Sequence, residues 1–297
     1  MRHELDAREY KLLLDPAKFD GPLSLTTAND FWYRQICQVV ERHLDRRKDG
    51  SSRTCDEFHR LENRLVQFWD TRSCTLSSSD LVLRSRAPEP TAESTEPVQL
   101  TLKLRMEDYF VVSQTQLPST GRKPQTELEE DIAPLEVATA PRASDVVLPL
   151  KPSLRSRYSL STKVSYAWHP ERRTTGHLDT LFPTLATLLR APLPQDERLI
   201  GGPEIRECAM KGAKIRLGDG ITAEFTLTFW RFGPGFGTLD VAEMSFKCDL
   251  IDHAMSREAA DRALRFFLAV QSDLAGFATN SHSSKTAQAL PAGCSGG

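Results

Sequence analysis

Charged side chains recur at even spacings in several short segments that read as β-strands. Successive side chains of a strand point to opposite faces, so a spacing of two places both charges on one face. Arginines offer forked donors to phosphate oxygens, lysines add point charges, and clustered carboxylates hold Mg2+ or Mn2+. These residue types therefore point to the binding of a polyphosphate, with metal-assisted chemistry where carboxylates lie beside the cations. The charges that share a face are Glu9 and Lys11, Arg84 and Arg86, Lys103 and Arg105, Glu127 and Glu129, Lys214 and Arg216, and Glu243 and Lys247.

The same pattern has a structural alternative, which the residues alone leave open. An ordinary amphipathic sheet presents its polar face to water, and cross-strand ion pairs form on such faces. In residues 100–105, leucines take one face while Thr101, Lys103 and Arg105 take the other. If the sheet curls into a barrel with its leucines outward beneath helices, the charges line the interior. Unpaired charges there cost several kcal/mol each, so such an interior requires a charged ligand.

Strands carry the charged pairs in both halves of the chain, and helices interrupt each half. Several connections are too short for the crossover helices of a parallel sheet, which favours an antiparallel α+β arrangement. Ser256 is positioned to cap a final helix whose apolar face begins at Ala259. We expect strands at 9–14, 64–70, 81–86, 98–105, 126–132, 158–168, 209–217, 223–232 and 239–248, and helices at 28–44, 178–189 and 256–274.

The chain is expected to form one domain over residues 1–280. Residues 133–152 hold four prolines and little periodicity, so they read as a loop that joins the halves 1–132 and 153–280. Neither half contains enough strands to close or cover its own sheet, which favours one domain over two. The tail 281–297 is small and polar and is expected to be disordered.

Composition excludes some classes of protein. The 297 residues carry 38 Lys and Arg against 40 Asp and Glu, a balance that argues against bulk nucleic-acid binding. No apolar run reaches the length of a membrane helix, and the charged start does not resemble a signal peptide, so a cytoplasmic location is expected. The six cysteines are widely separated and form no Cys-x-x-Cys pair, so we expect reduced thiols.

The order of the charged motifs resembles the CYTH, or triphosphate tunnel metalloenzyme, superfamily over most of residues 7–275. The family opens with Glu-x-Glu-x-Lys; here Glu9 and Lys11 match, and Ala7 replaces the first Glu. The further segments that resemble family motifs are 68–71 (Phe-Trp-Asp-Thr) with 81–86 (Leu-Val-Leu-Arg-Ser-Arg), 100–103 (Leu-Thr-Leu-Lys), 127–129 (Glu-Leu-Glu), 214–216 (Lys-Ile-Arg) and 241–245 (Val-Ala-Glu-Met-Ser). Compact members of the family lack the insert 16–61, which could be a lid, a homodimer surface or a partner site.

The resemblance implies an antiparallel β-barrel of eight or more strands, a tunnel with helices packed on its outside. It implies a phosphate-binding set comprising Lys11, Arg84, Arg86, Lys103, Arg105, Lys214 and Arg216. It implies that Glu9, Glu129 and Glu243 bind Mg2+ or Mn2+, with Glu127 ranked second. The implied catalytic residues are Glu9, Glu129 and Lys11. By strand parity alone, Lys163 and Arg231 are further candidates for inward-facing cations.

By the same resemblance, the leading hypothesis is a metal-dependent phosphohydrolase that acts on inorganic triphosphate or on a nucleoside or other organic triphosphate. A triphosphate-containing small molecule is the expected partner. Ala7 and Ser245 each replace a carboxylate that the family uses for metal. The alternatives are a non-catalytic binder of a phosphorylated ligand with a degenerate metal site, an adenylate cyclase of the same superfamily, and a structural protein with an internal salt-bridge network.

Overall fold

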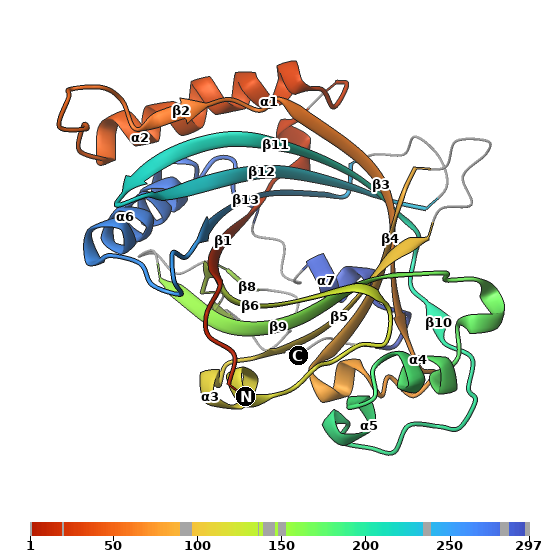
Figure 1. The fold of residues 1–297 in the computed structure, drawn as a ribbon. Helices are drawn as coiled ribbons and strands as arrows, with labels where there is room; N and C mark the ends of the chain where they lie inside the picture. Colours follow the sequence, from red (N-terminus) through yellow and green to blue (C-terminus); the bar gives the residue numbers. More distant parts are fainter. Residues whose placement is uncertain are drawn as a thin grey trace.

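A computed structural model describes residues 2–19, 21–89, 97–135, 137–138, 146–147, 153–233, 239–279 and 285–294. Within these residues, nine strands from both halves of the chain close into one barrel, seen along its axis in Figure 1. Most of the expected loop 133–152 lies outside the described residues. The nine strands are β1 (Ala7–Leu14), β3 (Arg60–Asp70), β4 (Leu81–Pro88), β5 (Val98–Met106), β6 (Arg122–Pro134), β9 (Leu154–Tyr166), β11 (Ile205–Gly218), β12 (Ile221–Phe232) and β13 (Val241–Asp249).

The order of strands around the barrel is β3-β4-β5-β9-β6-β1-β13-β12-β11, and pairing of β11 with β3 closes it. Neighbouring strands run antiparallel except β1 and β6, which pair in parallel with Ala7 opposite Glu129. Strand directions cannot alternate around a ring with an odd number of members, so at least one parallel pair is unavoidable. The expected α+β barrel is confirmed. The expectation that it is purely antiparallel was wrong, because the ring of nine described strands contains the parallel pair of β1 and β6.

Four short strands lie beside the barrel. Two of them extend its edges, because β2 pairs with β11 and β10 pairs with β3. The other two pair with each other in a separate sheet. Their bounds are β2 (Thr54–Asp56), β10 (Ile200–Gly201), β7 (Val137–Ala138) and β8 (Val146–Val147).

The apolar faces of the strands point outward and pack beneath helices on two sides of the barrel. On one side, α1 (Leu25–Phe31), α2 (Cys37–His43) and α6 (Arg257–Asp273) lie beside β11 to β13 (Figure 1). The aromatic ring of Phe246 stacks on Tyr10 at 4.6 Å and meets Phe266 edge-on at 5.5 Å. On the other side, α3 (Tyr109–Gln114), α4 (Thr175–Leu181) and α5 (Leu185–Leu188) cover leucines of β4, β5 and β9. These six helices therefore occupy the outer surface and leave the polar faces of the strands inside.

Local signals set the ends of the helices. Ser24 caps α1 by accepting a hydrogen bond from the backbone N–H of Thr27 at 3.2 Å. A π-helical turn (Trp32–Ile36) then joins α1 to α2, so the expected helix 28–44 is built from three pieces. The predicted cap at Ser256 is confirmed, because its hydroxyl accepts from Ala259 N–H at 3.2 Å. The remaining short turns are 3-10 helices at Pro16–Lys18, Ser77–Ser79 and Pro170–Arg172.

The C-terminal segment differs from expectation in two respects. The expected disordered tail instead contains α7 (Lys285–Ala289), which Figure 1 shows inside the ring of strands. Cys294 forms a disulfide with Cys74, so the expectation of six reduced thiols was wrong for these two. The two cysteines are separated by 220 residues, so no local spacing in the sequence indicates that they pair. The fold brings them together. The other four cysteines are free thiols.

Among the described helices, none combines the length and the apolar character that crossing a bilayer demands.

Phe246→Ala should lower the free energy of unfolding by about 3–5 kcal/mol, because it empties the centre of the aromatic cluster beneath α6. Urea denaturation of the purified protein measures this change. Phe110→Ala is the matched control, since 63% of Phe110 is exposed, and it should change stability by less than about 0.5 kcal/mol. Equal effects of the two substitutions would contradict the packing described here.

Candidate functional site

A cavity of about 340 Å³ lies inside the ring of strands, and all nine strands contribute to its wall. Among the described residues, eleven basic and five acidic side chains line it, although the whole chain carries a formal charge of -2. The cavity is therefore net positive while the protein as a whole is not. The basic residues are Lys11, Arg64, Arg84, Arg86, Lys103, Arg105, Arg155, Arg157, Lys163, Lys211 and Lys285, and the acidic ones are Glu9, Glu129, Asp131, Glu207 and Glu243.

Arg84 and Arg86 project from β4 into the cavity. The Nη2 of Arg86 donates to Glu207 Oε2 at 3.0 Å, but the buried Nε atoms of both Arg84 and Arg86 have no hydrogen-bond partner in the described part of the chain. Burial and the neighbouring Arg86 lower the pKa of Arg84 to about 9, which leaves it positive at neutral pH. A buried donor without a partner is unfavourable, and an anionic ligand would satisfy it.

We call the part of the cavity lined by Arg64, Arg84 and Arg86 its arginine-rich end. Glu207 of β11 is a carboxylate at this end. Its Oε2 also accepts a hydrogen bond from Trp230 Nε1 at 3.0 Å, and Arg64 Nη1 lies 3.6 Å from its Oε1. Burial opposes the ionisation of Glu207, but Arg86 and Lys285 outweigh burial and lower its pKa to about 2. One ionised carboxylate thus lies among several arginines, and this end retains excess positive charge.

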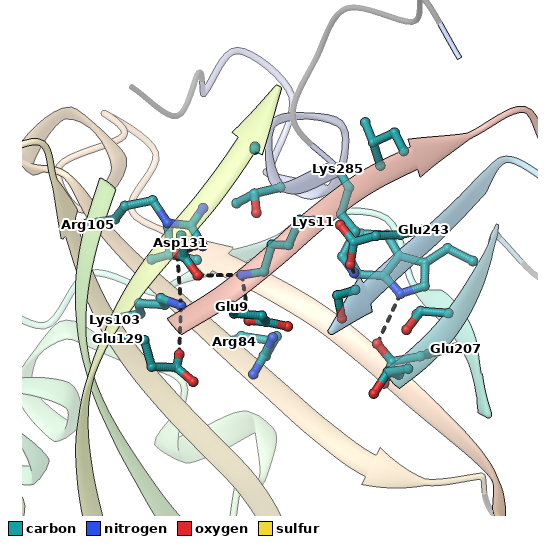
Figure 2. A pocket seen from close by; sticks show the side chains of 18 of the residues that line it. Glu9, Lys11, Arg84, Lys103, Arg105, Glu129, Asp131, Glu207, Glu243 and Lys285 are labelled. Carbon is teal, nitrogen blue, oxygen red and sulfur yellow. Dashed lines mark hydrogen bonds and ion pairs between the residues drawn. The ribbon is translucent and has the colours of Figure 1, made fainter. Parts of the chain in front are cut away.

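A second cluster lies where β1, β5 and β6 face one another. Carboxylate oxygens of Glu9, Glu129 and Asp131 lie within 4.8 Å of one another. Lys11 Nζ donates to Asp131 Oδ1 at 2.6 Å and lies 2.8 Å from Glu9 Oε2. Lys103 Nζ lies 3.5 Å from Glu129 and 3.4 Å from Asp131, as Figure 2 shows. Three carboxylates at this separation form an oxygen-only donor set of the kind that Mg2+ and Mn2+ prefer.

Nearby cations keep two of these carboxylates ionised. Burial opposes the ionisation of Asp131, but Lys103 and Lys11 hold its pKa well below its ordinary value. For Glu129, Lys103 and Lys247 likewise outweigh burial and lower the pKa to about 2. A carboxylate with so low a pKa is a weak proton acceptor at neutral pH. The geometry therefore suits Glu129 and Asp131 to holding a cation better than to abstracting a proton.

Glu243, an expected metal ligand, lines the cavity away from the three clustered carboxylates. On β13, Glu243 pairs with Leu13 of β1, whereas Glu9 pairs with Lys247. Four residues along a strand correspond to about 13 Å, so the register separates Glu243 from Glu9. Its Oε1 accepts instead from Lys285 Nζ at 2.5 Å. Asp131, rather than Glu243, completes the acidic cluster.

Three other expected site residues lie outside the cavity wall. Gly212 adopts φ +109°, and a β-bulge interrupts β11 between Lys211 and Lys214. Pairing of β11 with β3 ends at Lys211, so Lys214 and Arg216 lie beyond the ring, on the part of β11 that pairs with β2. Glu127 is ion-paired with Lys163 and Lys247. Of the two cations expected from parity alone, Lys163 lines the cavity and Arg231 does not.

Several lining residues escaped the sequence analysis, and some of them had a signal. Asp131 continues the same-face series Glu127, Glu129 on β6, so strand parity could have found it. Glu207 and Lys211 likewise share one face of β11. Lys285 had no such signal, because it belongs to a short helix that only the fold brings into the barrel.

The stability gap between wild type and Glu207→Gln should narrow as the pH falls from about 4.5 to 2. The folded-state pKa of Glu207 is depressed below its reference value of 4.5, so its contribution is fully present above that pH and disappears on protonation. Urea midpoints measured at intervals from pH 7 to 3 check this. Glu4→Gln is the control, since its side chain is 68% exposed, and it should show no comparable narrowing. A gap independent of pH would refute the assigned environment of Glu207.

No family model and no curated protein matches this sequence. Three solved structures are similar. HpAC1, a putative adenylyl cyclase from Hippeastrum described as having a dominant triphosphatase activity, is 15% identical with a TM-score of 0.37, covering 95% of this chain and 94% of that one. PH1819 from Pyrococcus horikoshii OT3 is 12% identical, with a TM-score of 0.33 and coverages of 94% and 96%. A putative adenylate cyclase from Bacillus halodurans is 12% identical, with a TM-score of 0.36 and coverages of 97% and 98%.

Proposed function

We propose that the barrel binds a triphosphate-containing small molecule and hydrolyses it with the help of Mg2+ or Mn2+. The observation that carries this proposal is the convergence, in one net-positive cavity, of arginines whose buried Nε atoms have no hydrogen-bond partner in the described residues and a cluster of carboxylates. Cations alone would bind a phosphate chain, whereas carboxylates beside them support metal-assisted hydrolysis. Inorganic triphosphate fits the proposal directly, and nucleoside triphosphates fit it with their organic part at a mouth of the barrel.

The acidic cluster fits a divalent cation by its donor set. Glu9, Glu129 and Asp131 would hold the ion through oxygen atoms, the ligands that hard cations favour. Bound there, a divalent cation would neutralise charge on phosphate oxygens. The lowered pKa values of Glu129 and Asp131 support this role, because both remain ionised at neutral pH.

The chain's own residues would bind and orient the phosphates. Arg84 and Arg86 would donate to phosphate oxygens and neutralise the charge that develops during in-line attack by water. The buried hydroxyls of Thr101 and Ser161 line the cavity and have no hydrogen-bond partner among the described residues, so they are available as further donors. In hydrolysis of inorganic triphosphate, water attacks a terminal phosphorus, the bond to the bridging oxygen breaks, and orthophosphate and diphosphate form.

A non-hydrolysing binder is the second candidate, favoured by the state of the acidic cluster. Lys11 and Lys103 form ion pairs with all three of its carboxylates. Ala7 is fully buried on β1 and supplies no further carboxylate. If the lysines outcompete a divalent ion, the cavity binds phosphates without turning them over.

Purified protein should release orthophosphate from triphosphate, ATP or GTP in Mg2+ or Mn2+, and should release none in EDTA. Orthophosphate, diphosphate and cyclic nucleotide are measured together, so that hydrolysis and cyclisation are distinguished. Asp131→Asn should reduce turnover about 100-fold or more, because it weakens the proposed cation site. Glu130→Gln is the matched control, since Glu130 is on the same strand and pairs with Arg8 instead. Binding without turnover would support the second candidate, and absence of both would reject the two.

Arg84→Gln should weaken triphosphate binding in EDTA by about 10- to 100-fold, the effect of losing one or two charge-assisted hydrogen bonds. The same variant should be at least as stable as wild type without ligand, because it removes a positive charge that burial disfavours and a buried Nε donor without a partner. Titration calorimetry and urea denaturation measure the two quantities. Arg34→Gln changes an exposed arginine and should alter neither. A loss of stability without a loss of affinity would show that Arg84 is a structural residue.

A further inference from the structure

The C-terminal segment, defined here as residues 285–294, reaches into the barrel. Helix α7 lies within the ring of strands in Figure 1, and Lys285 and Thr286 belong to the cavity wall. Figure 2 shows the side chain of Lys285 extending toward Glu243. A segment distant from every strand motif in the sequence therefore contributes a cation to the site.

Apolar contacts and a covalent bond hold this segment in place. Leu290 is buried in a cluster with Phe68, Ile205 and Trp230. The chain approaches so closely at Gly202 that a Cβ there would lie 2.1 Å from the carbonyl oxygen of Ala289. The disulfide from Cys294 to Cys74 then ties the segment to the loop that follows β3. A five-residue helix is too short to be stable by itself, so its position depends on these attachments.

Lys285 lies among groups of the arginine-rich end. Its Nζ donates to Glu243 Oε1 at 2.5 Å and lies 4.6 Å from the centre of the Trp230 ring. Trp230 in turn donates to Glu207, which also accepts from Arg86. Trp230 and Glu207 therefore connect Lys285 to Arg86 through a series of contacts.

An ammonium group carries three donors, and the hydrogen bond to Glu243 uses one of them. Lys285 can therefore contact an anion without giving up Glu243. The ion pair also occupies the carboxylate of Glu243. The ammonium of Lys285 therefore lies where the sequence suggested that Glu243 would bind a metal ion.

We propose that Lys285 is a phosphate-binding residue of the barrel, supplied by the C-terminal segment and held at its position by the Cys74–Cys294 disulfide. This inference rests on the proposed function and adds to it a binding residue from outside the strands. It also makes the affinity for polyphosphate depend on the oxidation state of one cysteine pair.

Binding of inorganic triphosphate in EDTA, measured by titration calorimetry, tests the role of Lys285. Lys285→Gln should weaken binding about 10-fold, and Lys285→Arg should restore most of it, because one charge-assisted contact is lost and regained. Lys18→Gln is the matched control at an exposed lysine and should leave affinity unchanged. Glu243→Gln should bind as well as wild type or more tightly, since it frees the ammonium of Lys285. If the ion pair were only structural, both partners' substitutions would weaken binding alike, and the proposal would be overturned.

The same titration tests the disulfide. A dithiol reagent reduces Cys74–Cys294 to two thiols and is itself oxidised to a disulfide. The affinities of reduced wild type and of Cys294→Ser should both fall toward that of Lys285→Gln. The double variant Cys294→Ser, Lys285→Gln should bind little more weakly than Lys285→Gln alone. Unchanged affinity after reduction would reject the role of the disulfide. If wild type binds triphosphate and Lys285→Gln binds it equally well, this inference alone is rejected. If wild type does not bind triphosphate, the proposed function is rejected as well.

Discussion

Every second side chain of a closed ring of strands points into a space that bulk water does not fill. In this barrel those side chains are largely charged, and charges away from bulk water are tolerated when partners satisfy them. Eleven basic and five acidic described residues cannot all pair with one another, so the interior keeps a positive excess. The near-neutral charge of the whole chain conceals this, because acidic residues outnumber basic ones outside the cavity lining. The helices outside the barrel bury the apolar faces of the strands, which leaves the charged faces inside.

The excess is distributed unevenly along the barrel. At the acidic cluster, Lys11 and Lys103 lie within ion-pair distance of the carboxylates, so positive and negative groups nearly balance. At the arginine-rich end, Glu207 lies within ion-pair distance of both Arg64 and Arg86, and Glu62 also forms an ion pair with Arg64. A phosphate chain would therefore be attracted most strongly at one end while the other end presents oxygen donors to a cation.

The position of β1 explains how the acidic cluster forms. β1 inserts between β6 and β13, in parallel with the first and antiparallel to the second. Because Ala7 lies opposite Glu129, the next residues on the same face bring Glu9 and Lys11 beside Asp131. The parallel pair is a consequence of the odd number of strands in the ring. The same topology carries Glu243 away from the cluster, where the C-terminal segment supplies its partner.

Alternation along a strand is local, so the sequence was enough to predict which side chains share a face. It thereby placed Arg84 beside Arg86 and Glu9 beside Lys11, and the cap at Ser256 was equally readable, since its hydrogen bond spans three residues. It did not place Lys214 and Arg216, because a bulge at Gly212 and the end of β3 pairing take β11 beyond the ring. The folded chain was needed to identify the partner of Glu243, the Cys74–Cys294 disulfide and the presence of Lys285 inside the barrel. These contacts join residues tens to hundreds of positions apart, and closure of the ring sets them, not any local pattern.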